Sequence, residues 1–565
     1  MSFYNDVQKE INKSTDNYMI TENGAVVYSS VGNAMVDFEF AINSLRNAPE
    51  QEIYDKIQKA YAENPELTTK MIFQIGDIRE GKGERHIFNS CIKFLETEHP
   101  KILKELLPLI PEYTRWDYAI RLATSKNQDI ATATRKMIVN QIKEDRQLLS
   151  ENKPISLCAK WMPSIQSKKP EDRKLALKLE KALGLNHKGY RKLLSELRDR
   201  LNIIEKKLSL KQEITREDLS KMSSKALLKY SEGMSQDETF QEFMEGVAEG
   251  KETINTAVLT PADIVHKYTT QAGWTVQVKP YDLATENMWN NLKDTIKEQA
   301  ASTIVIRDGS GSMEERVNSQ SSVTCLEVAT ALSIYCAEKM PEGLKDKFIT
   351  FSRNPELIDM SKLDTLHDKL QLCYRYNDCS NTDLKKTFDL LLNTLKNNHI
   401  SQEDAPKNLL ILSDMEFDSC YQGCSYNKTD MHNQLKPLFS QIREEWEAEG
   451  YKIPTLVFWQ LNVNRSPIPE IDNDLGIVYV SGYTTENLDL VLSGELAKFT
   501  PEQQLEIILS NERYNAIGEA FNIGLENERN SAKHSVGKND VIDMQDLQSK
   551  LSPPERTPSF YDFYR

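Results

Sequence analysis

Two aspartates and three hydroxyl residues carry the strongest chemical signal in this sequence. Three of them lie in the segment RDGSGSM directly after an apolar run, one lies in SNTDL before a helical pattern, and one ends a second apolar run. Ligands of a parallel sheet bind outside the carboxyl ends of its strands, so we expect these segments to meet at one edge. Carboxylate and hydroxyl oxygens suit Mg²⁺, which takes few protein ligands and keeps part of its hydration. The sequence therefore predicts a divalent-cation site at Asp308, Ser310, Ser312, Thr382 and Asp414.

The competing interpretation of these residues is a serine-rich turn that caps a helix, with Asp414 only an acidic strand end. The three segments follow one another in the expected order, each after a strand or before a helix, which favours the metal site. Arg307 argues against it, because a cation that pointed into the cage would weaken metal binding.

The segments that must position these side chains alternate between short apolar strands and helices over residues 296–500. Such alternation is typical of a parallel, doubly wound sheet with helices on both faces. The sequence predicts helices over 323–340, 383–398 and 431–450. The strands are predicted at 303–307, 347–351, 408–413, 454–461 and 476–481.

Residues 35–295 instead repeat apolar residues at three- and four-residue spacing, broken by Pro, Gly and Asn. They show no strand pattern and no clean repeat, which favours an irregular, HEAT-like array or ring of stacked helical pairs. The fold class predicted for the whole chain is therefore α plus α/β, a helical array followed by a doubly wound, Rossmann-like domain.

The two ends of the chain are expected to lie outside these domains. Residues 1–34 form an N-terminal segment, and residues 501–527 are predicted to be a helical extension. Residues 528–565 are polar and are interpreted as a mobile tail with aromatic anchors at Phe560, Tyr561, Phe563 and Tyr564.

Charge is distributed unevenly along the chain. The 565 residues include 70 Lys plus Arg and 85 Asp plus Glu, for a formal net charge of −15. Residues 151–230 hold 20 Lys plus Arg against 10 Asp plus Glu, a local +10, so the remainder carries −25 (−15 minus +10). Segregated charge indicates either a polyanion-binding surface or a run of solvated helices, and the sequence leaves both open.

Composition also excludes several classes of protein. No apolar run approaches the length needed to span a bilayer, so no membrane partner is expected. The polar N-terminus lacks a secretory signal core, and eight cysteines in a chain this long do not make a disulfide scaffold. We expect reduced thiols and a cytoplasmic location.

Three motifs suggest chemistry without completing it. Gly76-x₄-Gly81-Lys82-Gly83 lacks the hydroxyl residue and the preceding strand of a phosphate-binding loop, so a turn between helices is predicted, with Lys82 and Arg85 facing a ligand. The serines of the GSGS segment have no recognisable histidine partner, so no enzyme is expected. Four cysteines flank the predicted metal loops, but their spacing fits a zinc knuckle poorly. Free thiols are favoured over structural Zn²⁺, and a disulfide stays open, at Cys373, Cys379, Cys420 and Cys424.

The series Asp308, Ser310, Ser312, then Thr382, then Asp414 resembles the metal-ion-dependent adhesion site (MIDAS) of von Willebrand factor A (vWA) domains. That resemblance implies Mg²⁺ binding and recruitment of an acidic protein partner, whose carboxylate completes the metal coordination.

A helical array followed by such a domain resembles the Ro/TROVE family of RNA-binding rings, and more closely a related TROVE–vWA branch described as a domain of unknown function. The resemblance covers residues 30–515. It is carried by GDIREGKGER at 76–85, EYTRWDYAI at 112–120, ISLCAKWMPS at 155–164, YRKLLSELRDRLNIIE at 190–205, DGSGSM at 308–313, NTDLKKTFDLLL at 381–392, LSDMEFD at 412–418 and LVFWQLN at 456–462.

Ro-type rings bind structured or misfolded RNA, which requires cations for phosphates and planar groups for unpaired bases. The resemblance therefore implies RNA contacts from the basic helices, although a solvated face paired with Glu196 and Asp199 is the alternative. The expected RNA-binding residues are Lys82, Arg85, Lys160, Lys188, Tyr190, Arg191, Lys192, Arg198 and Arg200, with His187 and Trp161 beside them.

Two functions from different classes follow. The first is a non-catalytic RNA-binding protein whose sheet domain recruits a partner through its metal site. The alternative is a protein–protein scaffold or a packaged particle component without a nucleic-acid role, which the acidic remainder and the aromatic tail favour.

Overall fold

The computed structural model describes most of the 565-residue chain. The described residues are 18–20, 26–28, 30, 32–42, 45, 48–201, 207–208, 212–256, 259–272, 275–292, 294, 302–317, 322–341, 343–351, 355–376, 384–414, 438–461, 477–481 and 499–536. Thr382, Cys379, Cys420, Cys424 and the aromatic tail at 560–564 lie outside them.

A six-stranded sheet organises the C-terminal half, in the order β10-β9-β8-β5-β6-β7. Neighbouring strands are parallel except at the β6–β7 edge, which is antiparallel. All five predicted strands are confirmed, but the sheet is mixed rather than wholly parallel. Strand β7 was missed because it is short and turns only one side chain inward. The strands are β5 (Thr303–Asp308), β6 (Lys347–Phe351), β7 (Glu356–Asp359), β8 (Asn408–Ser413), β9 (Thr455–Gln460) and β10 (Ile477–Ser481).

Helices cover both faces of this sheet, so the central strand β8 is buried along its whole length. Helices α19 (Cys325–Glu338) and α20 (Leu366–Arg375) pack on the face that holds Leu410 and Leu412. Helices α21 (Leu384–Asn397) and α22 (Leu438–Ala448) flank the opposite face. The α plus α/β class predicted from the sequence is confirmed at this level.

The N-terminal half is helical, as predicted, apart from a short hairpin of β3 (Thr269–Ala272) and β4 (Thr275–Val278). The expectation of no strands in this region is therefore wrong at the hairpin, where alternating β-branched residues gave a weak signal. A second two-stranded sheet pairs β1 (Tyr18–Ile20) with β2 (Val26–Tyr28). The helices are α2 (Ala34–Ala41), α3 (Glu50–Glu63), α4 (Pro65–Gly76), α5 (Arg85–Glu98), α6 (Pro100–Leu106), α7 (Ile110–Tyr113), α8 (Trp116–Leu122), α9 (Gln128–Ser150), α10 (Cys158–Trp161), α11 (Pro170–Ala182), α12 (His187–Arg200), α14 (Arg216–Ser220), α15 (Ser224–Met234), α16 (Glu238–Ala248), α17 (Pro261–Tyr268) and α18 (Leu283–Asn290).

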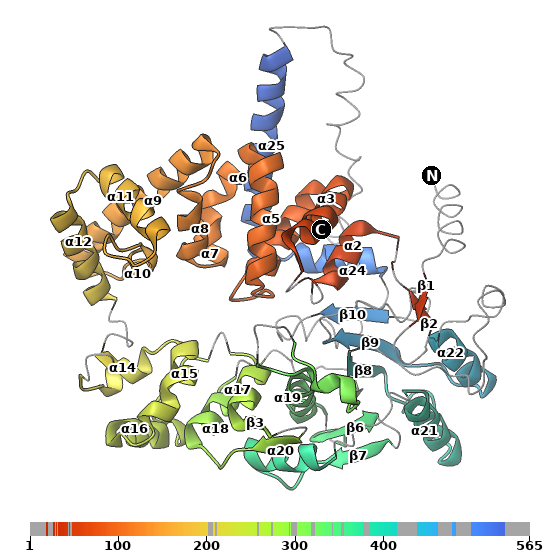
Figure 1. The fold of residues 1–565 in the computed structure, drawn as a ribbon. Helices are drawn as coiled ribbons and strands as arrows, with labels where there is room; N and C mark the ends of the chain where they lie inside the picture. The colour runs from red at the N-terminus through yellow and green to blue at the C-terminus, as the bar shows by residue number, and fades with distance from the viewer. Residues whose placement is uncertain are drawn as a thin grey trace.

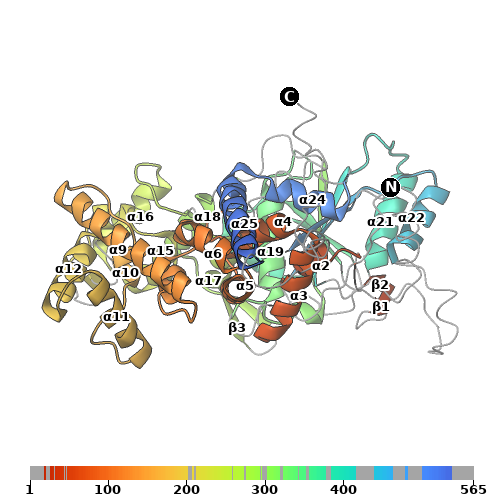
Figure 2. The same cartoon turned by 90° about the horizontal axis from the view of Figure 1, so that it is seen from above.

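The helices and the sheet form two tiers (Figure 1). Helices α2–α12 make the first tier, and α14–α18 lie with the sheet in the second. Seen from above, the molecule is elongated, with α11 and α12 at one end and α21 and α22 at the other (Figure 2). Helices α8–α12 have a hydrophobic cluster of their own.

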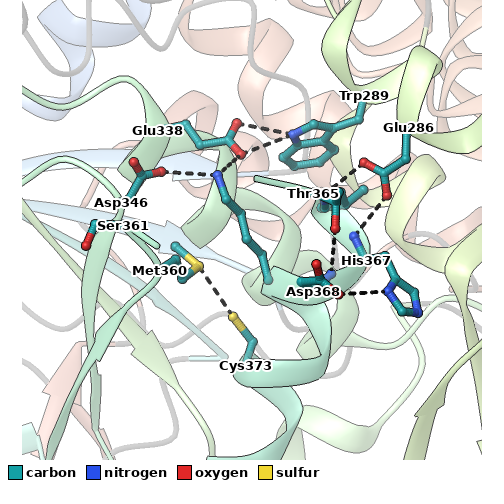
Figure 3. A network of polar contacts seen from close by, with 12 residues as sticks. Glu286, Trp289, Glu338, Asp346, Met360, Ser361, Thr365, His367, Asp368 and Cys373 are labelled. Carbon is teal, nitrogen blue, oxygen red and sulfur yellow. Dashed lines mark hydrogen bonds and ion pairs between the residues drawn. The ribbon is translucent and has the colours of Figure 1, made fainter. Parts of the chain in front are cut away.

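The core of the second tier crosses the boundary predicted near residue 295. Side chains of α14–α18 share one hydrophobic cluster with α19, α20 and the adjacent sheet face. Buried polar contacts cross the same boundary (Figure 3). Glu286 of α18 accepts hydrogen bonds from the backbone N–H groups of Leu366 and His367 at the start of α20, at 2.9 and 3.0 Å. Trp289 donates its indole N–H to Glu338 of α19 at 3.1 Å.

The C-terminal helices return to the beginning of the chain. Helices α24 (Pro501–Leu509) and α25 (Asn515–Val536) share a core with α2–α6 through residues such as Leu509 and Phe521. Helix α25 continues to Val536, so the polar tail predicted from residue 528 begins too early. The reason is packing against α6, where Asn527 donates to Glu105 at 3.3 Å and Glu528 lies 3.3 Å from His99.

One ion pair holds the C-terminal helices against the N-terminal helices. Asp77, directly after α4, is fully buried and accepts two hydrogen bonds from the Arg513 guanidinium, at 2.5 and 2.8 Å. The same guanidinium lies 4.9 Å from the centre of the Tyr113 ring, and the Tyr113 hydroxyl donates to the Arg513 carbonyl. A bidentate arginine–carboxylate pair of this kind holds two segments in one geometry.

We expect Arg513→Gln to lower the free energy of unfolding by about 3 kcal/mol, because it leaves the buried Asp77 carboxylate without its counter-charge. Urea unfolding followed by circular dichroism measures this. The matched control is Arg191→Gln, an exposed residue of α12, which should change stability by less than about 0.5 kcal/mol. Adding Asp77→Asn to Arg513→Gln should recover part of the decrease, and equal stability of the two single Arg variants would contradict the role assigned to the pair.

Candidate cation site and basic surface

Asp308 ends strand β5 and is fully buried at the carboxyl edge of the sheet. One carboxylate oxygen accepts a hydrogen bond from the Ser310 backbone N–H at 2.9 Å. The other accepts one from the Ser413 hydroxyl, at the end of β8, at 2.5 Å. These contacts fix the carboxylate between the two central strands.

Asp414 follows Ser413 directly and is also buried. Strands β5 and β8 are neighbours, with Arg307 paired to Leu412, so their carboxyl ends lie side by side. Burial raises the pKa of the Asp308 carboxyl, and the negative charge of Asp414 raises it further. Two carboxylates sharing a buried site repel one another, and a bound cation would relieve that repulsion.

The loop after β5 brings two hydroxyls to the same edge. Ser310 is buried, and its oxygen lies 3.1 Å from the Ser312 oxygen. Met313 is fully buried and anchors the loop. Four of the five predicted metal ligands are thus described at one edge, and the fifth, Thr382, lies outside the described residues, shortly before α21.

Arg307 points away from this edge. Its guanidinium donates to the Thr330 hydroxyl of α19 at 3.1 Å and to the Tyr376 carbonyl at 3.3 Å, and it lies 5.4 Å from the centre of the Phe348 ring. Successive side chains of a strand point to opposite faces of the sheet, so Arg307 and Asp308 diverge. Arg307 therefore does not place its positive charge at the predicted cation site.

The four cysteines near these loops are described only in part. Cys373 is buried in α20, where its sulfur lies 3.7 Å from the Met360 sulfur, and burial raises the pKa of its thiol to about 12. The other three lie outside the described residues. Among the residues that the structure describes, no three His, Cys, Asp or Glu side chains form a metal-binding group. The predicted site at Asp308 is not a group of this type, because two of its four described side chains are serines, which supply hydroxyl oxygens.

The glycine-rich segment forms a turn between α4 and α5, as predicted. A Cβ at Gly81 would lie 2.1 Å from the Gln74 carbonyl oxygen, and Gly83 has a φ of 65°, so both positions require glycine. Lys82 pairs with Glu39 at 2.6 Å, and its side chain is only 8% exposed. This geometry gives Lys82 a structural contact rather than a ligand-facing position.

Helix α12 divides the predicted RNA-binding residues into two groups. Tyr190 is buried and donates its hydroxyl to the Pro163 carbonyl at 2.9 Å, so its ring is not available for base stacking. Arg198 is half-buried and donates to the carbonyls of Ala159 and Met162, at 2.9 and 2.7 Å. Arg200 donates to the Asn152 carbonyl at 2.8 Å. These three side chains hold the segment before and around α10 in place.

The second group is exposed. Lys188 and Arg191 form no hydrogen bond or ion pair with any residue that the structure describes, and Lys192 has only a 3.7 Å contact with Glu196. His187 contacts the buried Glu180 at 2.7 Å. Exposed cations also line α11. Together the exposed basic residues of α11 and α12 include Lys174, Lys178, Lys181, Lys188, Arg191 and Lys192.

Two of the predicted RNA-binding residues, Arg85 and Lys160, lie at the two ends of a row of cationic and aromatic side chains that contact one another. Arg85 lies 5.4 Å from the centre of the Tyr118 ring, and Arg115 lies 5.6 Å from it. Arg115 also lies 4.5 Å from the Trp161 ring centre, and the Lys160 ammonium lies 5.9 Å from the same ring. We call these five residues the cation–aromatic series. They come from α5, α8, α10 and the residue before α8.

Asp117 aligns the two guanidinium groups of the series. It accepts two hydrogen bonds from Arg115, at 3.0 and 2.8 Å, and one from Arg85 at 3.1 Å. Arg85 and Arg115 remain 48% and 33% exposed. Arg115 and Tyr118 were not predicted to bind RNA, although the EYTRWDYAI segment that contains them was singled out by resemblance.

Comparison with known proteins gives matches along most of the chain. Residues 302–533 match a domain of unknown function, DUF7788. Residues 21–115 and 172–303 match a second, DUF2828. The chain is also 26% identical over 535 residues to uncharacterized protein L728 of Acanthamoeba polyphaga mimivirus, with 87% of each chain covered. Residues 116–171, which contain Trp161 and Lys160, lie outside both domain matches. Searching the described helices finds none with the length and apolarity to cross a membrane.

Arg198→Met should destabilise the protein by about 2 kcal/mol, because two buried backbone carbonyls would be left without their charged donor. Arg191→Met on the same helix is the matched control and should be nearly neutral, since its side chain is exposed. Thermal unfolding of both variants measures the difference. Equal midpoints would remove the structural role assigned to Arg198.

Proposed function

We propose that the sheet domain is a vWA-like binding module that uses a divalent cation, Mg²⁺ in the first place, to hold an acidic protein partner. The observation that carries this proposal is the pair of buried carboxylates, Asp308 and Asp414, at the ends of two adjacent parallel strands. Numbered from β5, the strands run in the order 3-2-1-4-5-6, and the order reverses between β5 and β8. Ligands of doubly wound sheets bind at that reversal.

The residues at this edge fit a cation of the magnesium type. Asp308 and Asp414 would supply the negative charge, Ser310 and Ser312 neutral oxygens, and Thr382 is the fifth candidate. Few charged ligands leave a bound Mg²⁺ electrophilic, which favours an added carboxylate from a partner. Ser413 and the Ser310 backbone hold Asp308 in a fixed orientation for this role.

Mg²⁺ should raise the unfolding temperature of the protein, by mass action worth about 2.7 kcal/mol at a concentration a hundred times its Kd. Asp308→Asn should abolish this shift and also raise the unfolding temperature without cation, because it removes one of two like charges while keeping the side chain's shape. The measurement is differential scanning calorimetry with Mg²⁺ and with chelator.

The matched control is Asp404→Asn, an exposed aspartate next to Ser401, which should keep the Mg²⁺ response. A response that survives in Asp308→Asn would place the cation elsewhere. Peptides selected for Mg²⁺-dependent binding should share an acidic residue, and their affinity should fall when that residue becomes its amide. Peptides that bind equally well with chelator would contradict the partner role.

RNA binding by the helical half is a second proposal, in keeping with the resemblance to Ro/TROVE proteins and to an irregular HEAT-like array. The specific observation that favours it is the cation–aromatic series, from Arg85 to Lys160, together with the exposed basic residues of α11 and α12. Rings and guanidinium planes stack with unpaired bases, and cations bind phosphates.

For RNA, the decisive variants are Trp161→Ala and the pair Lys188→Glu with Arg191→Glu. The first should lower affinity for single-stranded RNA by about 1–3 kcal/mol, because a base can no longer stack on the indole ring. The second should reduce the slope of log K against log salt by about 0.7 for each phosphate that the protein no longer neutralises. Filter binding at several salt concentrations measures both effects.

Arg198 is left unchanged in this test because it supports the fold. Lys362→Glu, an exposed lysine of the sheet domain, serves as the matched charge control and should leave RNA affinity unaltered. No binding to the wild-type protein at low salt would favour a scaffold or particle component without a nucleic-acid role.

A further inference from the structure

A serine, a histidine and a glutamate form a continuous hydrogen-bonded chain beside helix α19. The Ser322 hydroxyl lies 2.7 Å from Nε2 of His266. Nδ1 of the same ring lies 3.0 and 3.1 Å from the two carboxylate oxygens of Glu327. Nucleophile, base and orienting acid within hydrogen-bond reach of one another is the arrangement that activates a serine for covalent catalysis.

The acid of this chain is held firmly. Glu327 is the third residue of the α19 capping box and accepts a hydrogen bond from the Thr324 backbone N–H at 2.8 Å. Thr269, the first residue of β3 and directly after α17, also donates to it. The Glu327 side chain is only 6% exposed. Burial raises the pKa of its carboxyl, but the hydrogen bonds from His266, Thr269 and the Thr324 backbone together hold that pKa below its ordinary value. A buried, ionised acid can fix the histidine ring and stabilise its protonated form.

The histidine is more exposed to solvent than the glutamate, and the serine is exposed as well. The His266 side chain is 33% exposed, and Ser322 is an exposed residue. One neutral tautomer of His266, with the proton on Nδ1, satisfies both contacts: it donates to Glu327 and accepts from Ser322. Helix α19 begins three residues after Ser322, so its positive N-terminal end lies near any negative charge that develops there.

We propose that Ser322, His266 and Glu327 form a hydrolytic site for carboxylic esters, built from other residues than the predicted cation site at Asp308 and the exposed basic residues of α11 and α12. In the first half-reaction the Ser322 oxygen adds to the ester carbonyl carbon while His266 takes its proton. The carbon–oxygen bond to the alcohol then breaks, and His266 returns the proton to the departing alcohol. This leaves an acyl group on Ser322.

Water completes the cycle. It adds to the acyl carbon as His266 takes one of its protons, the bond to the Ser322 oxygen breaks, and the proton returns to that oxygen. The net reaction converts an ester and water into a carboxylic acid and an alcohol. Glu327 remains ionised throughout and acts by holding His266.

The chain contains a natural control for this geometry. His187 lies 2.7 Å from Glu180, which is buried, and so repeats the histidine–carboxylate half of the arrangement. No serine is paired with His187 in the described part of the chain. Chemistry that required only an exposed, carboxylate-bound histidine would arise at both places, whereas serine acylation requires Ser322.

The test is labelling of the full-length protein with a fluorophosphonate probe, in which the attacking serine oxygen displaces fluoride from phosphorus. We expect one labelled residue, Ser322, identified by mass spectrometry. Ser322→Ala should abolish labelling, His266→Gln should slow it by about 10²-fold or more, and His187→Gln should leave it unchanged. Hydrolysis of p-nitrophenyl acetate should fall in the same order.

Ser322 is exposed, so Ser322→Ala should keep the wild-type unfolding temperature, and a loss of labelling cannot then be ascribed to misfolding. Glu327 is left intact because it also caps α19. Absence of labelling in the folded wild-type protein would overturn the proposal, as would labelling that persists in Ser322→Ala. Neither result bears on Mg²⁺ or RNA binding, which are measured separately.

Discussion

The contact between Asp77 and Arg513 is the constraint that holds the helices following the sheet in the core of the helical tier. It joins the turn after α4 to the helices that follow the sheet, across 436 residues of sequence. Helix α24 contacts both β10 and α2, so the pair secures the helical tier to the edge of the sheet. The surrounding turn is built for this contact, because Gly81 lies too close to Asp77 and Gln74 to accept a side chain. Within the part of the chain that the structure describes, the helices at the two ends therefore form a single core.

In the sheet, side chains along β5 alternate between the two faces, which places the Arg307 and Asp308 charges on opposite sides. Arg307 is buried on the α19 face, where a hydroxyl, a carbonyl and an aromatic ring receive it. Asp308 projects to the other side and meets Ser413 from β8. A shift of one residue in register would exchange the two side chains and place a guanidinium at the predicted cation site. The apolar pairing of β5 with β8, buried on both faces, fixes that register and thereby the chemistry of the edge.

Sequence patterns predicted most of the local features but not the contacts between distant segments. Apolar runs predicted all five long strands, and the spacing of Asp308, Ser310 and Ser312 predicted a loop whose members do lie together. Helical periodicity on α12 identified its polar side chains but could not tell that Arg198 turns toward the carbonyls around α10. Likewise, His266 and Ser322 lie 56 residues apart, with no motif to connect them. Only the packing of α17 against α19 brings them together.

That packing also explains why the helical half and the sheet are not independent. Helix α18 supplies Glu286, whose carboxylate satisfies the first backbone N–H groups of α20, and Trp289 binds Glu338 on α19 (Figure 3). Helix α17 supplies His266 to Glu327. A chain beginning at residue 302 would therefore leave the α19 face uncovered and several buried polar groups without partners, which is costly. Helix α19, which follows the predicted cation loop, is thus held by residues that precede the sheet. The geometry of the Asp308 site and of the Ser322–His266–Glu327 chain therefore depends on both halves of the molecule.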